Sequence, residues 1–201
     1  MKRRMLTLAL GLVLLLSAAA CGTARPSAQS VTESAIQAIQ KGDPATLKQY
    51  WDEDLTDNSL FSPGSQEAAL FQALTKNLTY KVLSAQEDEK AGTAVVTVEF
   101  TNADMTEAVG SLMETLLSDA FQYALLPEDQ QPSDEELEAR YLTKFTDYLN
   151  GEDLPTKTTK VDIPLTLEDG QWVLSPDEEI ADAMFGGLIT VADSMEYAFS
   201  D

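Results

Sequence analysis

Apolar and polar positions along this chain predict helices first and strands afterwards. Apolar residues recur every three or four positions in residues 31–41, 44–51 and 66–76, which predicts three amphipathic helices. Ser30 and Glu33 have the spacing of a capping box, so the first helix is expected to begin at Ser30. The amino-terminal part of the fold is therefore predicted to be helical.

Strict alternation of apolar and polar residues follows and predicts an antiparallel sheet of about four strands. The alternating segments are residues 78–86, 93–101, 156–167 and 171–174. Asp169-Gly170 between the last two segments is typical of a two-residue hairpin turn. We expect one apolar face of this sheet to be covered by helices.

Two further helical segments separate the second and third strands. Residues 104–126 carry a wide apolar stripe, and Ser133 with Glu136 predicts a capped start for the second segment. A last helix after residue 176 is interrupted by Gly186-Gly187. The fold class predicted is α+β: N-terminal helices packed on a curved antiparallel sheet, with a helical hairpin inserted at about 104–150 and a C-terminal helix. The predicted stripe comprises Met105, Val109, Leu112, Met113, Leu116, Leu117, Ala120, Phe121 and Ala124.

The first 22 residues have a different pattern from the rest. Lys2, Arg3 and Arg4 precede an uncharged apolar run over residues 5–20, and Cys21 follows it. This arrangement predicts a secretory signal peptide, because the run is shorter than the roughly 20 residues that span a bilayer as a helix. The small residues before Cys21 also permit ordinary signal cleavage, which would leave a free thiol at the new N-terminus.

The leader resembles the signal peptides of bacterial lipoproteins, in which the cysteine after a small-residue box becomes the mature N-terminus. The resemblance implies a diacylglyceryl group on Cys21 and anchoring at the extracytoplasmic face of the cell membrane. Two acyl chains give stable attachment, whereas one chain binds only marginally. The predicted organisation is a signal peptide (1–20), a lipidated N-terminus and tether (21–30), and a single α+β domain (31–201).

The charge balance excludes some partners. The chain has 34 acidic and 13 basic residues, a net charge of −21. Nucleic acid is not an expected partner, since phosphate binding needs clustered Lys and Arg. An acidic exterior that keeps the protein solvated is the simplest interpretation. A cationic partner, or cations of the cell envelope, is the alternative.

The sequence lacks the residues that several kinds of catalysis require. The sequence has no histidine and a single cysteine, which removes Ser-His-Asp, Cys-His and His-metal chemistry. A carboxylate such as Glu99 or Asp162 could act as a base beside Tyr80 or Tyr141, but these acids are more simply solvent-facing strand residues. No metal or other cofactor is expected. The acidic clusters at 52–54 and 128–136 lack the spacing of a calcium loop, so helix caps and solvated loops are the preferred interpretation.

The order of elements carries a second resemblance. The segments KGDPATLKQYW, LTYKVLSAQ, AGTAVVTVEFTNADM and EDGQWVLS resemble those of the nuclear-transport-factor-like and ketosteroid-isomerase-like superfamily, a cone-shaped α+β fold. More narrowly, the chain resembles Gram-positive lipoproteins of uncharacterised families built on that fold. The resemblance implies an architecture and transfers no catalytic residue. An apolar pocket, if the cone encloses one, would be lined by aromatic residues, but ordinary core packing is the preferred interpretation of their spacing. These residues are Tyr80, Phe100, Phe121 and Trp172.

Three functions are compatible with these observations. The first is a non-catalytic module that binds a small apolar ligand or another envelope protein. The second is an enzyme, such as an isomerase or lyase, that uses a carboxylate in the pocket. The third is an envelope scaffold that dimerises through its sheet. These functions should be distinguished by whether the concave face of the sheet holds an open pocket or is filled by the inserted helices.

Overall fold

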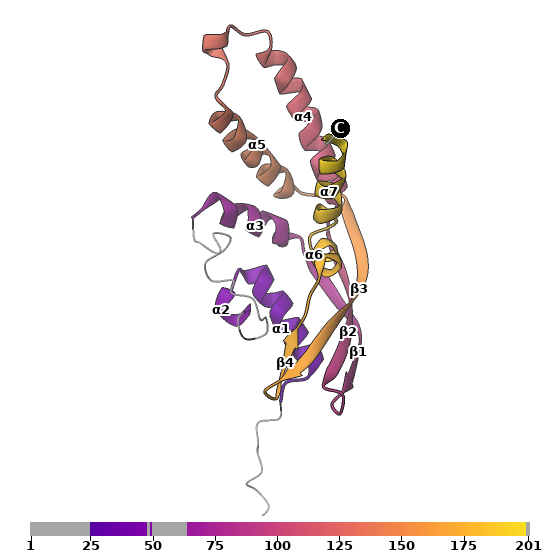
Figure 1. Cartoon of the computed structure of the whole chain (residues 1–201). Coiled ribbons are helices and arrows are strands. Elements are labelled where there is room, and N and C mark those ends of the chain that lie inside the picture. Colours follow the sequence, from indigo (N-terminus) through magenta and orange to yellow (C-terminus); the bar gives the residue numbers. More distant parts are fainter. Residues whose placement is uncertain (1–24, 48, 50–63, 200–201) are drawn as a thin grey trace, which may run out of the picture.

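The computed structural model describes residues 25–47, 49 and 64–199 of the chain. A curved sheet has helices against one of its faces, and a pair of helices projects from one end (Figure 1). The predicted α+β fold class is confirmed, with the helical pair inserted between the second and third strands.

The sheet has four antiparallel strands in the order β1-β2-β3-β4. Their register places Val96 opposite Ile163 and Val98 opposite Val161, so the apolar positions of β2 and β3 share one face. Asp169 and Gly170 have φ angles of 47° and 83°, as the predicted hairpin turn requires. The strands are β1 (Thr79–Asp88), β2 (Thr93–Ala103), β3 (Thr156–Glu168) and β4 (Gln171–Leu174).

Three helices precede the sheet: α1 (Ala28–Lys41), α2 (Pro44–Leu47) and α3 (Gln66–Lys76). The capping box predicted at Ser30 is wrong, because the hydroxyl of Ser27 accepts the backbone N–H of Ser30 and starts α1 at Ala28. Glu33 instead accepts a hydrogen bond from the side chain of Gln29. The folded region therefore begins before residue 31, where the sequence analysis placed its start.

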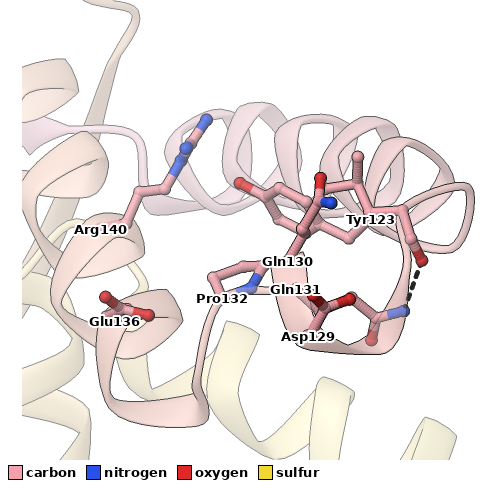
Figure 2. A pocket seen from close by; sticks show the side chains of 8 residues that line it. Tyr123, Asp129, Gln130, Gln131, Pro132, Glu136 and Arg140 are labelled. Atoms are coloured by element: carbon pink, nitrogen blue, oxygen red, sulfur yellow. Dashed lines mark hydrogen bonds between the residues drawn. The ribbon is translucent and has the colours of Figure 1, made fainter.

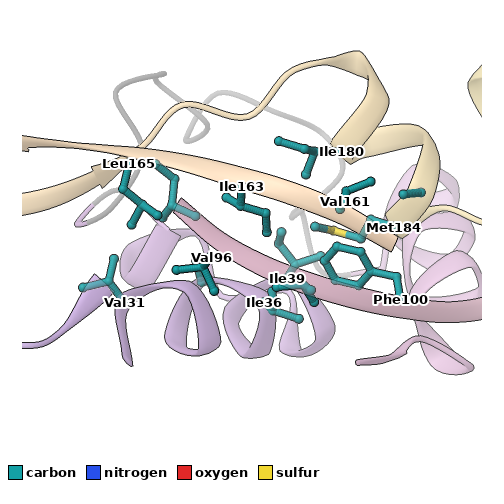
Figure 3. Packing of buried hydrophobic residues seen from close by; sticks show 14 of the residues in the cluster. Val31, Ile36, Ile39, Val96, Phe100, Val161, Ile163, Leu165, Ile180 and Met184 are labelled. Carbon is teal, nitrogen blue, oxygen red and sulfur yellow. The ribbon is translucent and has the colours of Figure 1, made fainter. Parts of the chain in front are cut away.

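The main core lies between α1, the sheet and α6 (Glu178–Met184). Helix α1 packs against β1, β2 and β4, while α6 packs against β2 and β3. Figure 3 shows side chains of α1 and α6 meeting those of the central strands. These contacts explain the strict alternation of β2 and β3, since one face of each strand is removed from water. The labelled members are Val31, Ile36, Ile39, Val96, Phe100, Val161, Ile163, Leu165, Ile180 and Met184.

The inserted hairpin comprises α4 (Met105–Tyr123), the short η2 (Glu128–Gln130) and α5 (Asp134–Leu149). The carboxylate of Asp104 caps α4, and the predicted capping box of Ser133 with Glu136 is present at the start of α5. Helix α4 continues from the end of β2 and leads away from the sheet (Figure 1). The hairpin thus extends the molecule instead of covering the apolar sheet face.

The C-terminal segment contains two helices, α6 and α7 (Leu188–Phe199), separated at Gly186-Gly187 as the sequence predicted. Gly186 has a φ of +65°, and a Cβ atom at this position would lie 1.9 Å from the carbonyl oxygen of Ala103. Its own carbonyl oxygen accepts the N–H of Met105, the first residue of α4. The glycine therefore joins the C-terminal helices to the base of the hairpin.

A buried asparagine, Asn102, which was not predicted, lies at the same joint. The Asn102 side chain donates hydrogen bonds to the carbonyl oxygens of Leu74 and Met184, at 2.8 Å and 2.9 Å. Its own oxygen accepts the N–H of Ala103. One residue thus connects α3, β2 and α6. The period of two places Asn102 on the inward face with Phe100, and this signal could have identified it.

Candidate functional site

The four aromatic residues predicted to line a pocket do not come together. Phe100 and Trp172 are 0% and 1% exposed and belong to the main core. Tyr80 is half-buried at the edge of that core, and its hydroxyl accepts a hydrogen bond from Gln37. Phe121 lies on α4 and is 75% exposed. Three of the residues therefore lie on strands of the sheet, and the fourth lies on the projecting hairpin.

The apolar face of the sheet is covered by the chain itself. Side chains of α1, among them Val31 and Ile36, and side chains of α6, among them Ile180 and Met184, lie against it (Figure 3). All four are buried. A ligand that reached Phe100 would have to displace one of these helices, and burial of each large apolar side chain contributes about 1.5–3 kcal/mol against such opening.

The candidate catalytic acids lie away from the core. Glu99 and Asp162 occupy the strand positions between the buried ones, on the outer face of the sheet. The carboxylate of Asp162 accepts a hydrogen bond of 2.6 Å from Thr97, whose hydroxyl also lies 3.1 Å from that of Ser84. These acids therefore occupy a polar, hydrogen-bonded sheet surface instead of an apolar cavity.

Tyr141 lies on α5, away from both strand acids. Burial raises the pKa of its phenol above the ordinary value, and the nearby negative charge of Asp119 acts in the same direction. A phenol with a raised pKa holds its proton more tightly, so it is a weaker proton donor. The fold therefore does not place Tyr141 beside Glu99 or Asp162.

A polar pocket of about 440 Å³ lies at the far end of the hairpin (Figure 2). It is lined by residues of the α4–α5 connection together with Tyr123, Glu136 and Arg140. The amide of Gln131 donates to the carbonyl oxygen of Leu126 at 3.2 Å, which closes this turn on itself.

Two charged groups of this pocket, those of Arg140 and Glu136, already have partners. The guanidinium of Arg140 lies 5.8 Å from the ring centroid of Tyr123, and its Nε atom lies 3.3 Å from the Asp119 carboxylate. Glu136 accepts hydrogen bonds from the backbone N–H and the hydroxyl of Ser133, which lower the pKa of its carboxyl group. The contacts of Arg140 connect the end of α4 with α5. The ionised carboxylate of Glu136 completes the capping box at the start of α5.

A buried carboxylate holds the two hairpin helices together. Asp119 of α4 is largely buried and lies 3.3 Å from both Arg140 and Lys144 of α5. Both cationic side chains remain partly exposed, so each retains contact with water. Asp119 therefore lies on the side of α4 that faces α5, together with the half-buried Leu112 and Leu116, seven and three residues earlier.

The apolar side of α4 is exposed in its second half. We call Leu117, Phe121 and Leu125, spaced four residues apart along α4 and the turn that follows it, the hairpin patch; Phe121 and Leu125 are 75% and 86% exposed. The stripe predicted on residues 104–126 is present: it is buried at Met105, half-buried at Val109, Leu112, Met113 and Leu116, and exposed from Leu117 onward. The reason is geometric: α5 packs on the side of Asp119, and α7 accompanies only the lower part of α4 (Figure 1).

The hairpin patch differs from the surface around it. No Lys or Arg occurs in α4 or α7, and the one acidic residue between Leu117 and Leu126 is the buried Asp119. Tyr197, on the last turn of α7, is also exposed. Exposed apolar side chains that gather in one place on a highly charged protein are typical of an interaction surface.

Two further features concern membranes and metals. Within residues 25–47, 49 and 64–199, no helix has the length and hydrophobicity needed to span a bilayer. The same residues contain no group of three or more acidic side chains arranged to hold a metal ion. The acidic cluster predicted at 52–54, and Cys21 itself, lie outside the described residues.

Comparison with known proteins shows a distant structural likeness. No protein-family model and no curated protein matches the chain. Its fold is similar to the crystal structure of a "putative lipoprotein (ycdA)" from Bacillus subtilis, with a TM-score of 0.51 and 14% sequence identity. The likeness covers 79% of this chain and 55% of that protein, so the chain spans about half of its length. The narrower assignment to the nuclear-transport-factor-like superfamily is not confirmed and stays a prediction.

Proposed function

We propose that this protein is a lipid-anchored, extracytoplasmic interaction module that binds another envelope protein through its helical hairpin. The anchor rests on the leader and on Cys21, which follows it directly. The structural likeness to a Gram-positive lipoprotein is compatible with this anchor. We also propose that the sheet and α1 have the cone-shaped fold of the nuclear-transport-factor-like superfamily.

The hairpin patch is the observation that carries the interaction. Its side chains, led by Phe121 and Leu125, are exposed in a protein with a net charge of −21. Bulky apolar residues are the groups that contribute most to binding energy when a partner removes them from water. A non-catalytic role fits the same features, since the carboxylates near the predicted pocket lie on the outer face of the sheet.

The alternatives have less support. A small apolar ligand would need a cavity beside Phe100 and Trp172, and both are packed against neighbouring side chains. Dimerisation through the sheet would use its outer face, where Thr101 and Thr158 hydrogen-bond to each other at 2.8 Å. The sheet does expose Leu83 and Val95, each by 41%, but these two side chains offer a second copy less apolar area than the more exposed Phe121 and Leu125 of the hairpin patch.

Site-specific photocrosslinking in intact cells tests this proposal. A photoreactive phenylalanine analogue replaces Phe121 in one variant and Lys160, on the outer sheet face, in the other. We expect a discrete protein adduct only from position 121, and we expect Leu117→Glu with Leu125→Glu to abolish it. An adduct from position 160 alone, or none from position 121, would contradict the proposal.

Mass spectrometry of the purified native protein tests the anchor separately. The mature chain should begin at Cys21 and carry the additional mass of a diacylglyceryl group. A chain that begins at Met1, or a processed chain without acyl mass, would exclude the anchor while leaving the hairpin interaction open to the crosslinking test.

A further inference from the structure

The first described residues are attached to one end of the sheet. The guanidinium of Arg25 lies 5.2 Å from the ring centroid of Trp172, within the range of a cation–π contact. The same group donates a hydrogen bond of 2.8 Å to the carboxylate of Glu89. Glu89 belongs to the turn between β1 and β2, and Trp172 belongs to β4, so Arg25 connects both edges of the sheet.

A second contact fixes the chain three residues later. The backbone N–H of Ala28, the first residue of α1, donates to the carboxylate of Glu87 at 2.7 Å. Glu87 lies near the end of β1, next to the same turn. Residues 25–28 are thus held at the end of the sheet that carries the β1–β2 and β3–β4 turns, which we call the turn end.

The distance from Cys21 to this attachment is short. Arg25 lies four positions after Cys21, with three residues between them. A fully extended chain spans at most about 3.3–3.6 Å per residue, so the lipidated cysteine would lie within about 14 Å of Arg25 in any conformation. The predicted tether of residues 21–30 is effectively reduced to its first four residues, because the rest is held by the fold.

The hairpin patch lies at the opposite end of the molecule. Strand β2 begins beside the turn end and leads into α4, which extends further in the same general direction (Figure 1). Eleven strand residues span about 36 Å and 19 helical residues about 28 Å, so the two ends are roughly 60 Å apart.

We infer that the turn end faces the lipid bilayer and that the α4–α5 hairpin presents its patch away from the membrane. This inference rests on the proposed lipid anchor at Cys21. The short tether holds the turn end at the lipid surface. Because anionic lipids repel a protein with a net charge of −21, a domain fixed at one end should stand away from the surface instead of lying on it.

Energy transfer to a labelled membrane tests the orientation in the full-length, lipidated protein. Acylation consumes the only natural cysteine, so an introduced cysteine provides a unique thiol for a donor dye. Lys90→Cys labels the turn end and Gln130→Cys labels the end of the hairpin, both at exposed positions. The vesicles contain phosphatidylethanolamine, phosphatidylglycerol and an acceptor-labelled lipid, and flotation first measures how much protein is attached.

We expect transfer from position 90 to be several-fold more efficient than transfer from position 130. Equal transfer, or stronger transfer from position 130, in protein that floats would overturn the orientation while leaving the anchor intact. Protein with a mature N-terminus that does not float would overturn the anchor, and the orientation with it.

Removing the contacts of Arg25 tests whether they set the orientation of the domain on the membrane. Arg25→Ala lengthens the free tether, so transfer from position 90 should fall and the ratio between the two positions should move toward one. Lys81→Ala is the matched control, because it removes a basic group from an exposed position on β1. An unchanged ratio in Arg25→Ala would show that Arg25 does not set the orientation.

Discussion

The body of the molecule, formed by α1, the sheet and α6, contrasts with the projecting α4–α5 hairpin. Both regions have apolar residues at the spacing of an amphipathic element, and both carry a large aromatic residue on that face: Phe100 in the body and Phe121 in the hairpin. The first is completely buried and the second is 75% exposed. Periodicity therefore predicts which face of an element is apolar, but not whether the same chain covers it.

The difference follows from the number of neighbours that each element has. Strand β2 lies between two strands and is covered by two helices, whereas α4 is flanked by α5 and, along its lower part, by α7. Asp119 faces Arg140 and Lys144, so Phe121, two residues later, lies on about the opposite side of α4. These ion pairs and the apolar contacts at the base of the hairpin together place α5 on one side of α4 and leave the hairpin patch outside.

The largest expected effect comes from making the same substitution in both regions. Phe100→Ala should lower the free energy of unfolding by about 3–5 kcal/mol, because it leaves a cavity in the main core. Phe121→Ala should change it by less than about 0.5 kcal/mol, since the side chain is already in water. Chemical denaturation of both variants measures the contrast. Similar losses in the two variants would mean that the hairpin patch is buried.

The joint between the two regions should be nearly as sensitive. Gly186→Ala should cost roughly 3 kcal/mol, because its φ is positive and the new Cβ would collide with the Ala103 carbonyl group. Gly170→Ala is the control: its φ is also positive, but no atom lies within 4 Å of the added carbon. Its cost should be near 1 kcal/mol. Equal thermal stability of the two variants would argue against the close approach at the joint.

Loss of the buried acid should affect the hairpin alone. Asp119→Ala should cost about 1–2 kcal/mol, a modest value because Arg140 and Lys144 can still reach water. Hydrogen exchange should accelerate in α4 and α5 and remain unchanged in the central strands. Faster exchange across β2 and β3 would show that the hairpin and the body unfold as one unit.

The smallest effect concerns pH. The hydrogen bonds from Ser133 lower the pKa of Glu136 in the folded protein below its ordinary value of 4.5. Its contribution to stability is therefore complete above that value and is lost as the pH falls through the lowered pKa. In Glu136→Gln the side-chain amide can still accept the capping hydrogen bond, but it has no carboxyl group that becomes protonated. Acidification should therefore weaken the start of α5 less in this variant than in the wild type.

Hydrogen exchange of α5 between pH 6 and pH 3 measures this difference. Glu138→Gln removes an exposed carboxylate of the same helix outside the capping box and should titrate like the wild type. Identical pH dependence for Glu136→Gln and Glu138→Gln would contradict the proposed role of the cap.

Local signals in the sequence predicted much of the fold. The alternation of β2 and β3, the Asp169-Gly170 turn and the Ser133–Glu136 cap each depend on residues close together in the chain, and each is present. Two serines compete to start α1, and only the tertiary context decides that Ser27 is used. The start of a helix is therefore less predictable than its existence.

The functional surfaces were harder to predict because they depend on distant contacts. The exposure of Phe121 follows from the placement of α5 by Asp119, and the contact of Arg25 with Trp172 joins residues far apart in the sequence. Phe121 could line one pocket with Tyr80, Phe100 and Trp172 only if α4 lay against the concave face of the sheet. Helices α1 and α6 cover it instead.

Hydrogen exchange of the anchored protein in native membranes, compared with the purified protein, tests whether a partner covers the hairpin patch. We expect residues 117–126 and the last turns of α7 to gain protection in the membranes, while the outer face of β2 and β3 is unchanged. Protection that appears on the sheet and not on the hairpin, or no difference between the two samples, would contradict it.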